Sequence, residues 1–419
     1  MPVRYLGTVR KSITLGHGIP FIPEFLRDEE HFLFRRMADR DRALLFIGSV
    51  SDRDAPDFSE GPMIKDWTYG HLAYEWKEHT HGQVSRHVGP QHLEPSQWRV
   101  PQWVIEWQGG EAFLHAREQD LQAAEAIVPL LAHGVQDKAV GPMPGWTCST
   151  TRERYLEQAH KLLRHIHRGD IYEVNYCTER HAAWPELDPY SGFMRLLKGA
   201  DAPFAAFYRL GERFAICASP ERFLSFVGDR CTGEPMKGTR RRGANVEEDA
   251  RLCNELAIDA KERSENIMAL DVMRNDLSRM ASSGSVVVEG LCEVRSYPRV
   301  HQMVSTVAAR IRPGHTPFDM VRVAFPMASM TGAPKISAMK LIDEAEDQAR
   351  GLYSGSLGFF APDGTGDLNV VIRTLLFDRT TGVASLSTGS ALTAQCDPEQ
   401  EWEECEVKAR SVLEALSHA

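Results

Sequence analysis

The chain has 419 residues, 42% of them hydrophobic and 25% charged, which is ordinary globular composition with enough length for a large core. Its formal net charge of −10 excludes a chain-wide basic footprint for nucleic acid, so an anionic ligand needs a local cationic pocket. Residues 1–16 lack the apolar core of a signal peptide, and no run approaches the ~18 apolar residues of a membrane-spanning helix. The eight cysteines form no Cys-x-x-Cys pair, so neither zinc nor a disulfide framework is indicated and we expect a cytoplasmic protein.

The first third of the chain is the hardest to divide into elements. Residues 42–50 are predicted as a strand, and the aromatic-rich residues 66–78 as a packed segment. Residues 136–150 carry Gly and Pro residues that are typical of a linker. We therefore expect an N-terminal part over 1–145 and a core over 150–419.

A helix is predicted to start at Thr150 and to end at Gly169, because the apolar residues between them recur at helical spacing. That apolar face consists of Tyr155, Ala159, Leu162 and Ile166. Residues 171–180 alternate in polarity, which predicts a half-buried strand with Glu173 and Asn175 on its polar face.

The rest of the chain groups its strands in runs between a few long helices. Short strands are predicted over 214–237 and 285–310, separated by a helical region over 246–280. Another helix is predicted from Pro334 to about residue 346, then a strand meander over 355–393, in whose middle strand Asn369 and Arg373 share a polar face. A last helix follows Asp397. This order predicts an α+β protein with mostly antiparallel sheets rather than a doubly wound fold.

Two predicted helices each carry a pair of glutamates three residues apart, Glu262 with Glu265 and Glu401 with Glu404. This spacing puts each pair on one helical face, where like charges repel unless a cation lies between them. Carboxylate oxygens suit Mg²⁺. The alternative is a solvated helix face beside nearby lysines.

Two further side chains have the chemistry of catalytic groups. Glu221 lies between two predicted strands, where it could act as a general acid or base or pair with Arg222 on the surface. Lys237 is flanked by a proline and a glycine that restrict the backbone. It could be a nucleophile in a pocket or a solvated turn lysine.

Anion binding is the third kind of chemistry that the residues suggest. Arg373 is a candidate carboxylate clamp, because a guanidinium binds a carboxylate through two parallel hydrogen bonds. The small residues 388–391 could expose backbone N–H groups to an anion or form a glycine bulge. The arginines at 240–242 indicate a nucleic-acid patch only weakly, because the chain is acidic.

From about Tyr155 onward, the order and wording of these motifs resemble the chorismate-utilising enzymes, a family that includes anthranilate, aminodeoxychorismate, isochorismate and salicylate synthases. The first 140 residues match only weakly, mainly over 70–75. The matching stretches are 169–175, 219–223, 235–239, 271–277, 331–335, 369–374 and the last helix with Glu401, Glu404 and Lys408.

The resemblance implies a fold of two packed, mostly antiparallel sheets flanked by helices, with chorismate as substrate and Mg²⁺ as cofactor. The metal would be held by Glu262, Glu265, Glu401 and Glu404. Catalysis would fall to Lys237, Glu221 and Thr239. Substrate binding would fall to Arg373, Lys408, Tyr353 and the stretch of Gly389, Ser390 and Ala391.

Lys237 distinguishes the members of the family. Aminodeoxychorismate synthases resemble this chain in having lysine there, whereas anthranilate synthases typically have alanine. The lysine is thought to attack the ring at C2 before ammonia adds at C4, and we expect Arg240 and Arg373 to depress its pKa. Isochorismate and salicylate synthases carry a water-activating lysine where this chain has Glu173.

Two features bear on the alternatives. Gln302 stands where the family usually has a histidine, and His301 should face the other side of its strand, which favours amination without elimination of pyruvate. The chain lacks the Gly-x-Cys-x-Gly segment of glutamine amidotransferases, so ammonia is expected from a separate subunit. Anthranilate synthase component I is the second interpretation, and an inert relative that binds an amidotransferase is the third.

Overall fold

The computed structural model describes residues 3–5, 8–14, 22–38, 41–58, 63–87, 93–136, 138 and 140–417. Its strands form two sheets in which neighbours pair antiparallel. The larger sheet runs in the order β1 (Val3–Tyr5), β2 (Thr8–Ile13), β9 (Glu111–Arg117), β8 (Trp103–Gln108), β4 (Arg42–Ile47), β3 (His31–Arg36), β12 (Phe204–Leu210), β13 (Arg213–Ser219), β22 (Thr374–Asp378), β23 (Val383–Thr393), β11 (Glu173–Ala183) and β10 (Thr147–Cys148), with β19 (Gly332–Ala333) also on β11. The smaller sheet runs β16 (Met236–Arg241), β18 (Val300–Arg310), β15 (Arg230–Gly233), β14 (Arg222–Val227), β21 (Thr365–Asn369), β20 (Ser356–Phe360), β6 (Thr68–Leu72), β7 (Ser96–Val100) and β5 (Ser51–Arg53), with β17 (Val287–Ser296) on β18.

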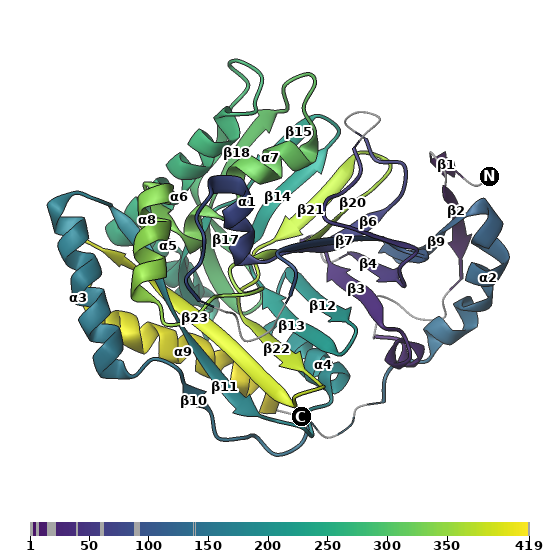
Figure 1. Ribbon diagram of the computed structural model, residues 1–419, viewed down its shortest axis with the longest axis horizontal. Coiled ribbons are helices and arrows are strands. Elements are labelled where there is room, and N and C mark those ends of the chain that lie inside the picture. Colours follow the sequence, from purple (N-terminus) through teal and green to yellow (C-terminus); the bar gives the residue numbers. More distant parts are fainter. Residues whose placement is uncertain are drawn as a thin grey trace.

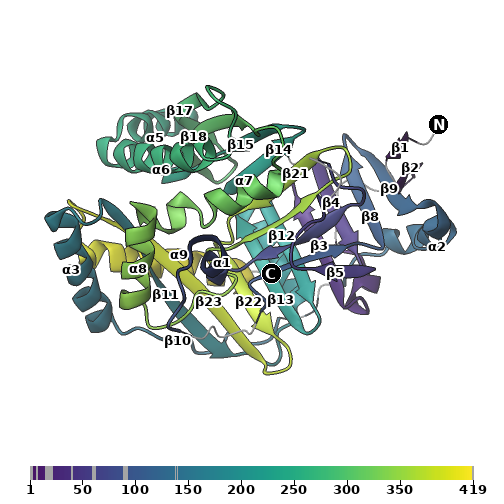
Figure 2. The same cartoon turned by 45° about the horizontal axis from the view of Figure 1, so that its top comes forward.

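Helices cover the outer faces of the sheets, as Figures 1 and 2 show. Their bounds are α1 (Lys77–His81), α2 (Leu121–Ala126), α3 (Arg152–Arg168), α4 (Pro189–Ala200), α5 (Val246–Ile258), α6 (Ala260–Ser278), α7 (Pro317–Ala324), α8 (Lys335–Ala345) and α9 (Pro398–Ser417). The long α9, yellow in Figure 1, runs along β23, while α5 and α6 lie beside β17 and β18.

A buried apolar layer between the two sheets holds them face to face. Leu44 and Phe46 from the larger sheet pack with Leu357 and Phe359 from the smaller one, and all four are almost fully buried. The ring centroids of Phe46 and Phe359 are 5.4 Å apart. Burial of large apolar side chains is the main favourable term in folding, so this layer fixes the relative placement of the sheets. The expected α+β architecture of two packed antiparallel sheets is therefore confirmed.

Several predicted elements need correction. The N-cap of α3 is Thr151 rather than Thr150, although the helix ends at Gly169 as expected, with that residue in the left-handed region. The predicted helical region over 246–280 is two helices, because Asp259 ends α5 and its side chain caps α6. Strand β11 is buried on both faces up to Arg180 rather than half-buried, since α3 and α8 cover one side.

Arg373 does not share a strand face with Asn369, contrary to the prediction. Strand β21 ends at Asn369 in the smaller sheet, and β22 begins at Thr374 in the larger sheet, so the chain changes sheets between them. Arg373 lies in this crossing with φ of 52°, a left-handed conformation that is uncommon for residues other than glycine. Alternation of polarity could not detect the crossing, because it continues through a segment that is no longer a strand.

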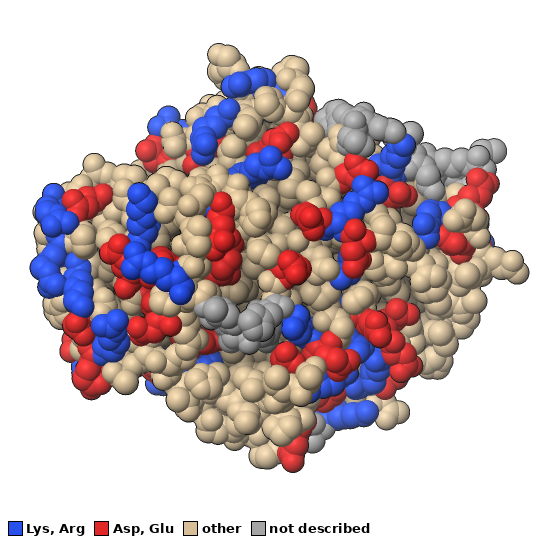
Figure 3. All heavy atoms as spheres, viewed as in Figure 1, with Lys and Arg blue, Asp and Glu red and all other residues tan. Residues whose placement is uncertain are grey.

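Basic and acidic side chains are interspersed over the face shown in Figure 3. Among the described residues, no helix is long and apolar enough to cross a membrane. The predicted linker over 136–150 and the polar start over 1–16 include residues outside the described ranges.

Candidate active site

A cavity of about 440 Å³ opens between β16 of the smaller sheet and β11 and β23 of the larger one, with α6 and α9 beside it. Twelve of the thirteen site residues expected from the sequence line it. They are Glu221, Lys237, Thr239, Glu262, Glu265, Tyr353, Arg373, Gly389, Ala391, Glu401, Glu404 and Lys408.

Ser390 is the exception, because its side chain lies on the other face of β23. Its hydroxyl shares a 2.9 Å hydrogen bond with the hydroxyl of Tyr155 from α3. Gly389 and Ala391 point to the cavity instead, as alternation along a strand requires. A Cβ at Gly389 would lie 2.5 Å from the Cys177 sulfur and 2.7 Å from Oδ1 of Asn175, so a side chain there would displace both groups.

Lys237 lies at an irregularity of β16 where the pairing with β18 shifts register. The next residue, Gly238, has φ of 76°, which glycine adopts at little cost. The Lys237 ammonium donates to Oε1 of Glu173 at 2.5 Å, and the two side chains are only 11% and 5% exposed. The lysine is thus held inside the cavity by a carboxylate of the opposite sheet.

The expectation that arginines depress the pKa of Lys237 is wrong. Burial opposes the charge, but the carboxylates of Glu173 and Glu265 outweigh it and raise the pKa of Lys237 above its usual value. Arg240 is instead occupied by Asp259, to which it donates at 2.8 Å. Lys237 therefore carries a positive charge, balanced by the carboxylate of Glu173.

The surroundings of Glu221 favour the protonated form of its carboxyl group. Its side chain is buried, and burial raises its pKa to about 7 despite a 2.7 Å hydrogen bond from the Ser329 hydroxyl. A carboxyl group with this pKa is substantially protonated at neutral pH and can give a proton to a leaving group.

The four glutamates of α6 and α9 face one cavity, but each has a basic neighbour. Lys261 lies 3.3 Å from Glu401 and 3.8 Å from Glu265, and Lys408 lies 2.6 Å from Glu404. Arg240 lies 3.4 Å from Glu262. Among the described residues, no three acidic, histidine or cysteine side chains form a ready-made metal cluster.

Even so, these four side chains offer carboxylate oxygens around one cavity, and such oxygens are the type of ligand that Mg²⁺ prefers. Oε1 of Glu265 is buried and has no hydrogen-bond partner. Such a carboxylate oxygen costs free energy unless a ligand binds to it. Burial also raises the pKa of Glu265 to about 7 and raises that of Glu401, whereas at Glu404 burial is outweighed by nearby lysines, chiefly Lys408, which lower its pKa.

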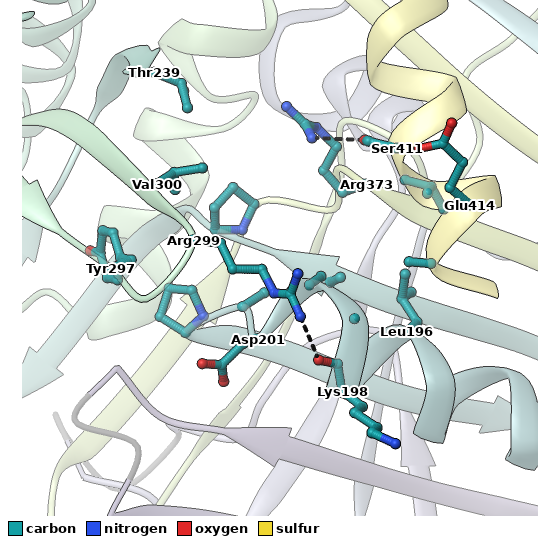
Figure 4. A pocket seen from close by; sticks show the side chains of 18 of the residues that line it. Leu196, Lys198, Asp201, Thr239, Tyr297, Arg299, Val300, Arg373, Ser411 and Glu414 are labelled. Carbon is teal, nitrogen blue, oxygen red and sulfur yellow. Dashed lines mark hydrogen bonds between the residues drawn. The ribbon is translucent and has the colours of Figure 1, made fainter. Parts of the chain in front are cut away.

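Lys408 and Arg373 add two cationic groups to the lining of the cavity. Nζ of Lys408 donates to the carbonyl oxygen of Gly389 at 2.8 Å, which ties α9 to β23. The Arg373 guanidinium donates to the Ser411 hydroxyl at 3.3 Å. Arg373 also lines a second cavity of about 510 Å³, shown in Figure 4. The two cavities share Pro220, Thr239 and Gln302 as well.

The family model of the chorismate binding enzymes matches residues 38–414. The chain belongs to this family. It is 38% identical over 364 residues to the aminodeoxychorismate synthase of Streptomyces griseus, a match that covers 84% of this chain and 50% of that protein. It is 38% identical over 271 residues to aminodeoxychorismate synthase component 1 of Escherichia coli, covering 65% and 59% respectively.

A relative with another name is nearly as similar. Anthranilate synthase component 1 of Thermus thermophilus is 37% identical over 286 residues, which are 68% of this chain and 61% of that one. The chain thus spans about half to three fifths of the length of these relatives.

Solved structures share the fold along almost the whole chain. The menaquinone-specific isochorismate synthase of Escherichia coli superposes with a TM-score of 0.80 at 15% identity, covering 98% of this chain and 94% of that one. Anthranilate synthase component I of Streptococcus pneumoniae gives 0.76 at 21% identity, covering 96% and 94%.

In this chorismate binding enzyme, Gln302 takes the place where the family usually has a histidine. Gln302 lines both cavities, and its Oε1 is buried without a hydrogen-bond partner. His301 faces away, as expected, because its ring is held by Asp249 at 2.9 Å and Ser296 at 2.8 Å. His301 lines neither of the two cavities.

Sequence reasoning missed three partners in the site. Glu173 lies on the polar side of its predicted strand, which is a usable signal for a site residue, but nothing in the sequence pairs it with Lys237. Ser329 lies two residues before a matched motif but carried no signal of its own. Lys261 lies on the same helix as Glu262 and Glu265, but its partner Glu401 is 140 residues further along the chain, which local sequence does not reveal.

Proposed function

We propose that the chain is the synthase subunit of an aminodeoxychorismate synthase, which converts chorismate and ammonia to 4-amino-4-deoxychorismate in para-aminobenzoate and folate synthesis. The observation that carries this proposal is the position of Lys237. A buried lysine faces the same cavity as the acid Glu221 and the carboxylate-binding Arg373. The identity to proteins named aminodeoxychorismate synthase supports the same function.

Substrate would be held at its carboxylates. Arg373, Lys408 and the backbone around Gly389 would bind one carboxylate, since guanidinium, ammonium and peptide N–H groups all donate to such an anion. Glu262, Glu265, Glu401 and Glu404 would hold Mg²⁺, which supplies a positive charge for a substrate carboxylate when it is bound. Lys261 and Lys408 would then have to leave the glutamates they now contact.

The chemistry proposed is a pair of displacements. The Lys237 amine bonds to C2 of the ring, the C1–C2 double bond shifts to C1–C6, the C5–C6 double bond shifts to C4–C5, and the C4 hydroxyl leaves with a proton from Glu221 as water. Ammonia then bonds to C4, both double bonds shift back, and the lysine departs with the electron pair of its bond to C2. The C4 ammonium sheds a proton that restores Glu221.

The ammonia would come from a separate glutamine amidotransferase subunit in the cytoplasm. The sequence has no Gly-x-Cys-x-Gly nucleophile segment with which to release ammonia from glutamine. Concentrated ammonium salts should therefore replace the partner in vitro.

Anthranilate synthase component I is the second candidate, because the Thermus thermophilus protein of that name is 37% identical. Lys237 argues against it, since direct attack by ammonia needs no lysine. An inert, amidotransferase-binding relative is the third, and the retention of Lys237, Glu221, Arg373 and the four glutamates in one cavity argues against that.

One incubation separates the three. The purified chain is mixed with chorismate, Mg²⁺ and an ammonium salt, and the products are weighed by mass spectrometry. Aminodeoxychorismate keeps the pyruvyl ether and anthranilate does not. Consumption of chorismate to anthranilate favours the second candidate, and no consumption favours the third.

A further inference from the structure

Glu173 and Lys237 reach each other from different sheets. Glu173 begins β11 of the larger sheet, and Lys237 lies on β16 at the edge of the smaller sheet. The 2.5 Å contact joins two side chains that are only 11% and 5% exposed. The position of Glu173 is fixed by its backbone, which is paired with Thr393 on one side and with Ala333 on the other.

Two other carboxylates face the lysine without bonding to it. Glu265 on α6 and Glu221 before β14 both act on its charge, but neither donates to nor accepts from its nitrogen. Glu221 accepts from Ser329, and Glu265 lies nearest to Lys261. Among the described residues, Glu173 is thus the carboxylate placed to receive a proton directly from Lys237.

We propose that Glu173 is a catalytic residue, the base that takes a proton from the Lys237 ammonium as the lysine attacks and returns it when the lysine leaves. This inference rests on the proposed function, because it requires the covalent lysine step. In the first displacement, one N–H bond of the ammonium breaks and an O–H bond forms on Glu173, which frees the electron pair that bonds to C2. In the second, the departing amine regains that proton and the ion pair is restored.

A glutamine at position 173 separates proton transfer from hydrogen bonding. The amide oxygen of Glu173→Gln still accepts from Lys237 but cannot take its proton at neutral pH. The rate of covalent adduct formation is measured by intact-protein mass after mixing with chorismate and Mg²⁺ without ammonia, from about pH 6 to about pH 10. At neutral pH we expect the variant to react about 100-fold more slowly. Its rate should climb about tenfold per pH unit as solvent deprotonates the lysine.

Glu179→Gln is the matched control. Glu179 lies six residues along β11, on the same side of the strand by alternation, and its side chain borders a separate small pocket. The same change of carboxylate to amide there should leave the adduct rate and its pH profile at the parent values.

Two further variants test the same proposal if Glu173→Gln does not fold. Glu173→Asp keeps a carboxylate and should keep the parent pH profile at a reduced rate. Glu173→Ala leaves space beside Lys237, and added formate should restore adduct formation where formamide does not.

The outcomes separate this inference from the function on which it rests. If the parent forms the adduct and Glu173→Gln forms it equally fast, or uniformly more slowly with an unchanged pH profile, Glu173 is not the base and the proposed function stands. If the parent itself forms no adduct, both are overturned.

Discussion

The ammonium of Lys261 lies 3.3 Å from Oε1 of Glu401 and so joins the two helices that carry the four glutamates. Its distance to Glu265 is 3.8 Å, so one cation serves a carboxylate from each helix. A divalent cation bound by these glutamates would compete with Lys261 for both carboxylates. Lys261 is about half exposed and can leave the site without opening the core.

The first prediction concerns competition between Lys261 and Mg²⁺ for the same carboxylates. Lys261→Met removes the cation between the carboxylates, so the affinity for Mg²⁺ should rise about tenfold in isothermal titration. Lys340→Met, which changes an exposed lysine on α8, is the control and should bind Mg²⁺ as the parent does. Glu265→Gln should lose Mg²⁺ binding and turnover without any fall in its unfolding temperature, because burial already disfavours the charged carboxylate. Turnover by Glu265→Gln in the presence of a chelator would contradict the metal assignment.

The second prediction concerns the backbone of Arg373. A left-handed φ costs a residue with a Cβ on the order of 1 kcal/mol relative to glycine. Arg373→Ala keeps this strain and Arg373→Gly relieves it, while both lose the guanidinium. Both variants should therefore raise KM for chorismate by about 100-fold. In denaturant titrations Arg373→Gly should be about 1 kcal/mol more stable than Arg373→Ala, and the reverse order would show that the conformation is not strained.

The fold followed from the sequence wherever one local pattern decided the outcome. The apolar spacing and Gly169 gave the extent of α3 to within about a turn, because both signals lie inside the element. Arg373 was misplaced because its conformation depends on a change of sheet. The predicted direction of the Lys237 pKa shift was wrong, because its partner Glu173 is 64 residues away along the chain and reaches it only from the other sheet. Local sequence reveals the periodicity and the capping residues of an element, but it does not reveal the distant neighbours that determine the pKa of a side chain.

The third prediction concerns the nitrogen source. The purified chain should make no aminated product from glutamine alone, because it lacks the amidotransferase nucleophile segment. Concentrated ammonium salts should support product formation, and an added amidotransferase subunit should confer use of glutamine. Isotope-labelled glutamine followed by mass spectrometry measures this directly. Labelled product from the single chain would mean that it generates its own ammonia.

The fourth prediction uses the buried carboxyl of Glu221. Burial raises its pKa from 4.5 to about 7, so the folded state binds the proton more tightly than the unfolded state. Its contribution to stability is full below pH 4.5 and is lost as the pH rises through 7. Glu221→Gln cannot ionise, so between acidic pH and about pH 8 it should gain up to about 3 kcal/mol of unfolding free energy over the parent. The unfolding free energies of the two proteins are measured by urea titration at acidic pH and at about pH 8. If their difference is the same at both pH values, the carboxyl of Glu221 is more exposed to solvent than the structure indicates.

The last prediction concerns Lys237 itself. If its amine bonds to the ring, incubation with chorismate and Mg²⁺ but without ammonia should leave the chain heavier by chorismate minus water, because no second nucleophile releases it. Lys237→Ala should lose this mass increase together with most of the aminodeoxychorismate formed with ammonium salts. Lys237→Met keeps the apolar stem of the side chain and separates loss of the amine from loss of packing. It should be as inactive as Lys237→Ala and closer to the parent in unfolding temperature. Parent rates of amination in both variants would mean that ammonia attacks the ring directly and that Lys237 serves only to pair with Glu173.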